Sequence, residues 1–274
     1  TVLRCLHCQV AAACGAAYQG LFKNPLADPY LIGVASGAGL GATIVLVSGV
    51  PLFVAGISVL PAAAFAGGMV AVVLAYMIAR QSSGTALTTL ILAGVAIASL
   101  AGAVTSLLMI RSDPDVKPVL SWLLGGFISA RWSYSAFVLA YLLPAGLTFA
   151  AYGRILNVLQ LDEDHAAQLG VNVERAKLLL VASATLGTAA AVSFSGLIGF
   201  VGLVAPHVVR LAWGSDYRFL LPMSALVGAG FLILADLVAR TIVTPAELPV
   251  GIVTAFCGAP FFLYLLRKRK TITL

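Results

Sequence analysis

The stretch from Ala86 to Ile110, ALTTLILAGVAIASLAGAVTSLLMI, has no charged side chain and only a few hydroxyls among small and apolar residues. A helix needs about 20 such residues to cross a bilayer core about 30 Å thick. Phe219–Ala239 is a second run of this kind, interrupted only by Asp236. Because further runs of spanning length occur along the chain, the sequence predicts that most of it lies in a membrane.

The composition supports this prediction. Charged residues make up 9% of the 274 residues and hydrophobic residues 61%, with a mean hydropathy of +1.05. Soluble domains carry about 25% charged residues. A transmembrane barrel would need alternating apolar and polar residues, which are missing. We therefore expect one all-α polytopic bundle over residues 1–274, with about nine spans at 2–22, 31–48, 52–79, 86–110, 134–152, 178–194, 197–212, 219–239 and 248–266.

Two segments need separate treatment. The apolar stretch 178–212 is too long for one span, so we divide it at Ser193–Gly196, where polar and flexible residues favour a tight turn. Val119–Ile128 is too short to span and is expected to lie in the interface or to re-enter. Gly33, Gly37 and Gly41 share one helix face and predict close packing against another helix.

The basic residues predict an orientation. Arg267–Lys270 directly follows the last span, and the positive-inside rule places it in the cytoplasm. Alternating the loops back through nine spans puts eleven of the 16 basic residues inside and five outside. The inside set is Lys23, Arg80, Arg154, Arg175, Lys177, Arg210, Arg218 and Arg267–Lys270, and the outside set is Arg4, Arg111, Lys117, Arg131 and Arg240. An odd number of spans puts the N-terminus outside, and we expect a further helix upstream.

Several kinds of site are not predicted. Cys5 and Cys8 have metal-like spacing, but no second ligand pair follows, so we expect no metal site. The basic residues form no stripe, which argues against a nucleic-acid partner. No G-x-x-x-x-G-K-[ST] motif is present, so this chain is not expected to bind ATP, or any other cofactor. No catalytic group is predicted either.

The most polar segment is the loop Gly153–Lys177. Asp162 is placed to cap a short helix that ends at Gly170, and Asn172 to cap the helix of the next span. Two short helices joined at a glycine make a rigid projection on the cytoplasmic side. Residues alone leave open whether this is an ordinary solvated loop or a docking surface for a partner.

Two further groups stand out in the C-terminal half. Asp236 and Arg240 are four residues apart and are expected to pair on one helix face, as a structural ion pair or as part of a proton relay. The second group is a glycine-rich run in which Pro206 is expected to break the helix, giving a joint or tight packing. Its residues are Gly199, Gly202, Pro206, His207 and Arg210. His207 has no second ligand nearby.

Several motifs occur in an order that resembles a known family. They are Asn24–Pro29, Leu31–Gly37, Leu92–Ala96, Trp122–Phe127, Gln168–Gly170, Gly199–His207 with Arg210, Leu234–Arg240, Ala246–Gly251 and Gly258–Pro260. The chain resembles the permease subunits of type II ABC importers for iron-siderophores, haem and vitamin B12. The likeness runs along nearly the whole chain, except that the first of the family's ten helices is missing.

The resemblance implies a bacterial or archaeal cytoplasmic membrane protein. It implies a second permease subunit, two ATPase subunits that hold ATP and Mg²⁺, and an external binding protein. The segment that matches the family's coupling helices contains Asp162, Glu163, Asp164, Gln168, Leu169, Gly170, Glu174 and Arg175. The position of Arg240 matches an arginine on which the binding protein docks. Alternating access would then move the substrate between the two permease subunits.

Other functions remain open on the residues alone. An ion-coupled secondary transporter would need coupling groups in mid-membrane, for which Asp236 is the acidic candidate. An intramembrane enzyme would need paired catalytic groups, and His207 has no evident partner in the sequence. A membrane scaffold without transport activity is not excluded. The sequence does not choose among siderophore, haem and cobalamin.

Overall fold

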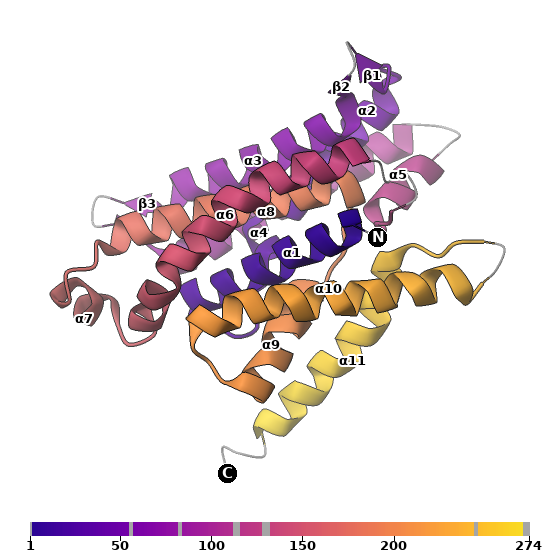
Figure 1. Cartoon of the computed structure of the whole chain (residues 1–274). Coiled ribbons are helices and arrows are strands. Elements are labelled where there is room, and N and C mark those ends of the chain that lie inside the picture. The colour runs from indigo at the N-terminus through magenta and orange to yellow at the C-terminus, as the bar shows by residue number, and fades with distance from the viewer. Residues whose placement is uncertain are drawn as a thin grey trace.

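The computed structural model describes residues 2–54, 57–81, 84–111, 116–127, 132–243 and 246–270 (Figure 1). Within these ranges the chain forms nine helices of 13 residues or more, one for each predicted span. They are α1 (Val2–Leu21), α2 (Val34–Ser48), α3 (Val59–Ala79), α4 (Leu87–Arg111), α6 (Trp132–Leu159), α8 (Val173–Ser195), α9 (Val201–Trp213), α10 (Tyr217–Thr241) and α11 (Val250–Lys270).

The remaining elements are short and lie between the long helices. They are the 3₁₀ helix η1 (Pro29–Ile32), α5 (Lys117–Leu123), α7 (Glu163–Gln168), and two antiparallel hairpins, β1 (Phe53–Val54) with β2 (Ile57–Ser58) and β3 (Arg80–Gln81) with β4 (Gly84–Thr85). Among the described residues, α3, α4, α6, α8 and α10 are long and apolar enough to cross a membrane. The helices α2 and α9 and the segment Val250–Leu265 of α11 are shorter apolar helices.

Helix α1 lies in the interior of the bundle, where it packs against α6, α8, α9 and α10 (Figure 1). Its residues from Val10 to Leu21 are almost entirely buried. The helices α2, α3 and α4 form a second group, which joins the first through contacts of α3 with α8. By contrast, α4 exposes large side chains such as Leu92, Leu100 and Ile110, as expected of a helix that faces lipid.

The predicted glycine packing is confirmed. Gly37 of α2 lies against the backbone of Gly67 in α3, and Gly41 lies against Ala63, so a side chain at either glycine would overlap the neighbouring helix. In lipid the hydrophobic effect does not bring helices together, so close packing through small residues holds them instead. Gly33 differs from the prediction because it has a left-handed φ of +90° and separates η1 from α2.

Three local predictions are wrong. The predicted loop Gly153–Lys177 begins later than expected, because α6 continues to Leu159. The third long helix begins at Val59 and not at residue 52, because the β1–β2 hairpin precedes it. This start places Pro61 in the first turn, where its missing N–H has no helical partner to lose. Pro206 does not break its helix, since α9 continues from Val201 to Trp213 around it.

The short elements α5, α7 and the two hairpins lie at two opposite ends of the bundle (Figure 1). The α7 end contains α7, the β3–β4 hairpin and the start of α10, while the α5 end contains α5, the β1–β2 hairpin and the end of α10. Described residues of the predicted inside set, such as Arg80 and Arg175, belong to elements that meet the α7 end. Arg240 belongs to the α5 end. The side chains of Arg4 and Arg131 lie outside the described residues.

Candidate functional site

The projection predicted from Asp162, Gly170 and Asn172 is present at the α7 end. The Asp162 carboxylate accepts a hydrogen bond from the Glu163 backbone N–H (2.7 Å) and caps α7. Gly170 follows α7 with a left-handed φ of +81°, which glycine adopts without strain. The Asn172 side chain accepts from the Arg175 N–H (3.0 Å) and caps α8. These local bonds define the short helix and the turn after it.

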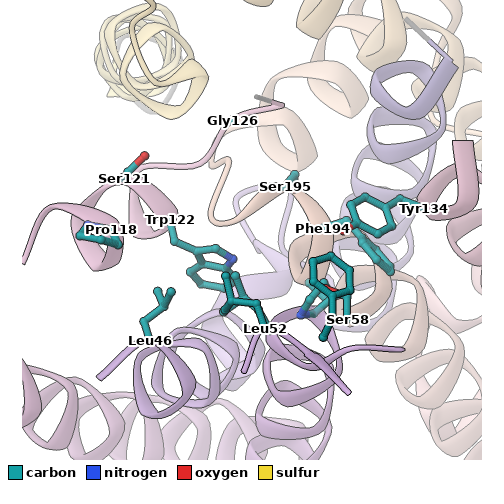
Figure 2. A pocket seen from close by; sticks show the side chains of 14 residues that line it. Leu46, Leu52, Ser58, Pro118, Ser121, Trp122, Gly126, Tyr134, Phe194 and Ser195 are labelled. Atoms are coloured by element: carbon teal, nitrogen blue, oxygen red, sulfur yellow. The ribbon is translucent and has the colours of Figure 1, made fainter. Parts of the chain in front are cut away.

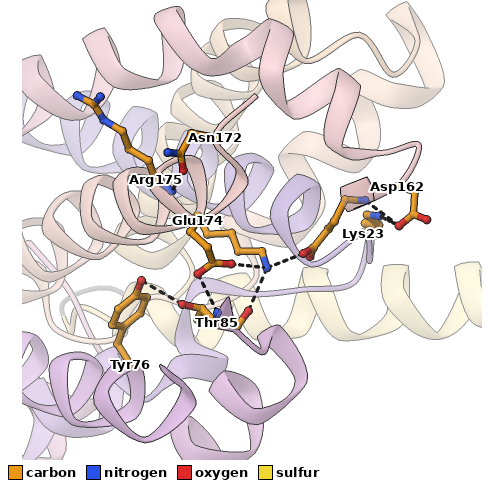
Figure 3. Close-up of polar contacts among 9 residues, drawn as sticks. Lys23, Tyr76, Thr85, Asp162, Asn172, Glu174 and Arg175 are labelled. Atoms are coloured by element: carbon orange, nitrogen blue, oxygen red, sulfur yellow. Dashed lines mark hydrogen bonds and ion pairs between the residues drawn. The ribbon is translucent and has the colours of Figure 1, made fainter. Parts of the chain in front are cut away.

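A buried lysine holds this projection to the rest of the bundle (Figure 3). The Lys177 ammonium donates to Glu163 Oε2 (2.7 Å), to Glu174 Oε1 (3.0 Å) and to the backbone oxygen of Thr85 (3.0 Å). The Thr85 N–H donates in turn to Glu174 Oε2 (2.8 Å). Lys177 therefore ties α7, α8 and the β3–β4 hairpin together through charge-assisted hydrogen bonds, which are stronger than neutral ones.

The predicted coupling residues separate into two groups in the structure. Asp162, Glu163 and Glu174 cap or anchor the projection. The other five are exposed at its surface, and Leu169 in particular leaves 67% of its accessible surface uncovered. These five are Asp164, Gln168, Leu169, Gly170 and Arg175.

Lys177 lies at the end of the predicted loop, but it is not among the predicted site residues. One signal was available, because Lys177 follows Glu174 by three residues and so shares its helix face. The contribution of Thr85 had no comparable signal, since it is 92 residues from Lys177 in the chain.

The glycine-rich run forms a second polar cluster at the α7 end. Because Pro206 has no N–H, the carbonyl of Gly202 lacks its usual helical donor, and the Gln19 side chain donates to it instead (3.0 Å). The Gln19 Oε1 accepts from Arg210 Nη1 (2.5 Å), and Arg210 Nη2 donates to the Tyr217 hydroxyl (3.3 Å). Gly202 also packs closely against Gly15 of α1. The predicted tight packing is confirmed here, with α1 as the partner.

The remaining residues of that run have different surroundings. The His207 ring contacts Phe261 of α11 edge-on, with ring centroids 5.8 Å apart. Gly199 lies in the segment between α8 and α9, and a Cβ there would meet open space. The expected turn at Ser193–Gly196 is confirmed, since α8 ends at Ser195 and Gly196 has a φ of +69°.

The Asp236–Arg240 pair is confirmed at the α5 end. Arg240 Nε donates to Asp236 Oδ2 (3.1 Å), and Arg240 Nη1 donates to Glu247 Oε1 (3.1 Å). The Asp236 side chain is buried, whereas Arg240 is about one-third exposed. Asp236 therefore fixes the guanidinium at the surface, where Arg240 and Glu247 face outward from the bundle.

A cavity of about 320 Å³ lies at the α5 end, between α2, α5, the β1–β2 hairpin and the end of α8 (Figure 2). Trp122, Tyr134 and Phe194 line it together with serines such as Ser195. The backbone N–H of Gly126 donates to the Ser195 oxygen (2.7 Å) and fixes one wall. Its volume is at the lower end of about 300–1,000 Å³ for ligand pockets.

The chemistry of the described residues includes no evident metal centre. Within those residues, no group of three or more His, Cys, Asp or Glu side chains is close enough together to hold a metal ion. Cys14 is buried and Cys257 is exposed, and neither forms a disulfide. The side chains of Cys5, His7 and Cys8 lie outside the described part of the chain, so the structure does not test their metal-like spacing.

A bundle of nine mostly apolar helices, with its polar groups at two opposite ends, defines a polytopic helical membrane protein. The chain belongs to the FecCD transport family, whose model matches residues 6–268. The cobalamin import system permease protein BtuC of Halobacterium salinarum is 49% identical over 259 residues, which cover 94% of this chain and 69% of the relative. The hemin transport system permease protein HmuU of Yersinia pestis is 41% identical over 262 residues, covering 94% and 78%.

Solved structures agree with the family. An inward-facing conformation of a metal-chelate type ABC transporter has a TM-score of 0.88 at 34% identity, covering 97% of this chain and 84% of that chain. PsaBC from Streptococcus pneumoniae has a TM-score of 0.64 at 14% identity, covering 96% and 88%, and shows similarity of fold alone. The expected all-α permease fold is therefore confirmed.

Proposed function

We propose that this chain is the permease subunit of an ATP-driven importer that takes a metal chelate or corrinoid from an external binding protein. Family membership and relatives named for cobalamin and hemin transport support this proposal. Cobalamin, haem and ferric siderophores are the candidate substrates. The protein would lie in a bacterial or archaeal cytoplasmic membrane with its C-terminus in the cytoplasm.

The observation that carries the proposal is the projection at the α7 end. Its fold is fixed by caps and by Lys177, while Asp164, Gln168, Leu169 and Arg175 remain on its surface. A rigid projection transmits force from a partner, whereas a mobile loop would absorb it. We infer that each of two cytoplasmic ATPase subunits, which hold ATP and Mg²⁺, receives this projection from one of two permease subunits.

In this mechanism, ATP binding brings the ATPases together and moves the projections. The motion passes through α7 and α8 into the bundle and opens the pathway between two copies of the permease alternately to each side. The ion-coupled alternative would use Asp236 as a coupling group. The buried Asp236 carboxylate is bound to Arg240, which favours a structural ion pair over a group that exchanges protons.

The test is to combine Leu169→Asp with Arg175→Glu and to reconstitute the variant with its ATPase subunits and binding protein in proteoliposomes. Both side chains are exposed, so the fold should persist. Loss of a central apolar anchor together with a charge reversal should lower ATPase association and ATP-dependent uptake by about tenfold or more. Uptake is measured with radiolabelled cobalamin and with haem.

Arg154→Glu is the matched control, because Arg154 is an exposed arginine near the same end but lies on α6. It should leave ATPase association unchanged. In the same vesicles, Arg240→Glu should weaken docking of the binding protein and leave the ATPase bound. Normal uptake by the Leu169–Arg175 double variant would show that the projection is not the coupling site.

A further inference from the structure

A second cavity at the α7 end has a chemistry that the transport proposal does not use. Its volume is about 320 Å³, and it lies among the end of α1, the end of α6, α9 and the turn before α10. Its lining includes the positively charged side chains of Lys23 and Arg210, the ring of His207, and the hydroxyls of Ser215 and Tyr217. No aspartate or glutamate of the described chain lines it, so the cavity is electropositive.

Arg210 is held in this cavity by neutral groups. Its guanidinium donates to the Gln19 side-chain oxygen (2.5 Å) and to the Tyr217 hydroxyl (3.3 Å). Both acceptors orient the guanidinium without neutralising its charge, and they use two of its five N–H groups. Within the described ranges, no carboxylate lies within 4.0 Å of Arg210. A half-buried, positively charged fork without a protein anion is a feature of sites that bind anions.

Lys23 also lines this cavity, and its backbone has an unusual conformation there. It has a φ of +50°, which is uncommon for a residue with a side chain. The turn is held by hydrogen bonds from the Lys23 N–H to the Gly20 oxygen (3.2 Å) and from the Asn24 N–H to the Gln19 oxygen (3.0 Å). The Gln160 side chain also donates to the Gly20 oxygen (2.7 Å). Among the described residues, Asp162 is the carboxylate within 4.0 Å of the Lys23 ammonium. Both side chains are solvent-exposed, so this pair is weak.

We propose that this cavity binds a phosphate group, carried by an anionic lipid headgroup or by a soluble phosphate. The Arg210 fork suits two phosphate oxygens, and the Lys23 ammonium adds a second positive charge. The Ser215 and Tyr217 hydroxyls supply neutral donors. Basic pockets between transmembrane helices at the cytoplasmic face bind lipid phosphates in this way, and the α7 end is the end we expect to face the cytoplasm.

The test measures binding without ATP, ATPase or transport, so its result is independent of the proposed function. The purified chain is placed in nanodiscs of phosphatidylcholine, whose headgroup has no net charge. Short-chain phosphatidylglycerol is titrated in one arm and inorganic phosphate in the other, with native mass spectrometry as the readout. Wild type is compared with Lys23→Gln and Arg210→Gln, and Arg154→Gln removes an arginine at the same end from outside the cavity.

We expect saturable binding that each cavity variant weakens about fivefold or more and that Arg154→Gln leaves unchanged. If phosphatidylglycerol alone binds in this way, the ligand is a lipid headgroup. If inorganic phosphate binds in this way, the ligand is a soluble phosphate. If Arg210→Gln does not fold, the exposed Lys23→Gln variant decides the result. The proposal is overturned if neither probe binds saturably, or if Lys23→Gln and Arg154→Gln weaken binding equally.

Discussion

At the scale of single residues, Lys177 joins three segments of the α7 end. Its side chain is 5% exposed, yet all three of its acceptors are polar groups of different segments. Burying an ammonium is unfavourable unless it is fully hydrogen-bonded, and here each of its three N–H groups has a partner.

Lys177→Met keeps the apolar stem and removes these bonds. We expect the free energy of unfolding to fall by about 1–3 kcal/mol, towards the lower value because both glutamates are partly hydrated. Amide hydrogen exchange in α7 should also become faster. Thermal unfolding in detergent measures the first effect. Arg175→Met is the control at an exposed position and should change the free energy of unfolding by less than about 0.5 kcal/mol. An equal loss of stability in both variants would contradict the role of Lys177.

Asp216 provides a pH-dependent contribution at the start of α10. The Arg218 side chain, which donates to Asp216 Oδ2 (2.7 Å), and the Asn157 amide, which donates to Oδ1 (2.7 Å), hold the pKa of this carboxyl well below its usual range. A lowered pKa in the folded state means that the charged form stabilises the fold above the unfolded pKa of about 3.9. This contribution to stability is lost as the pH falls below the unfolded pKa and through the lower pKa of the folded state.

The variant Asp216→Asn should therefore be less stable than wild type near neutral pH, and the difference should shrink as the pH falls below about 4. Melting temperatures of both proteins, measured in detergent over this pH range, test the expectation. A difference that stays constant across the range would mean that the Asp216 charge does not contribute.

At the scale of elements, α1 can occupy the interior because its surface is made of small residues. Gly15 lies directly against Gly202 of α9, and a Cβ at Gly15 would overlap the Gly202 backbone. Two backbones that touch at glycines cannot separate locally without moving their helices, because α1 is packed on its other sides by α6, α8 and α10.

Gly15→Ala should destabilise the fold by about 1–3 kcal/mol, since the helices must shift to accommodate the methyl group. Gly230→Ala in α10 is the control, because a Cβ there meets open space and alanine is the better helix former by about 1 kcal/mol. Melting temperatures of the two variants should move in opposite directions. A Gly15→Ala protein as stable as wild type would show that the α1–α9 contact is looser than described.

At the scale of the whole molecule, the two polar ends are expected to face opposite sides of the membrane. The test starts from a variant in which serine replaces Cys5, Cys8, Cys14 and Cys257. In this background, Asp164→Cys marks the α7 end and Leu52→Cys marks the α5 end. Both positions are exposed. A membrane-impermeant maleimide should label only Asp164→Cys in inside-out vesicles and only Leu52→Cys in right-side-out vesicles. Labelling of both positions from one side would contradict the predicted topology.

The sequence by itself determined the features that depend on neighbouring residues. Nine helices follow from apolar runs of spanning length, and the caps at Asp162 and Asn172 and the Asp236–Arg240 pair follow from spacings of a few residues. The start of α3 was also within reach, because Pro61 is accommodated best in a first turn. These features are local because capping and helix periodicity act within about one or two helical turns, and a hydropathy run covers about 20 consecutive residues.

Only the tertiary structure decided which distant groups meet. The Lys177 contact with Thr85 joins residues 92 apart, and the Gln19 contacts with Gly202 and Arg210 join residues 183 and 191 apart. Pro206 stays within α9 because a side chain from α1 supplies the donor that the helix lacks. The electropositive cavity likewise takes its residues from three helices, α1, α9 and α10, and from turns that adjoin α1, α6 and α10. Such contacts depend on how the helices pack, and helix packing is fixed by the fit of whole surfaces rather than by any short stretch of sequence.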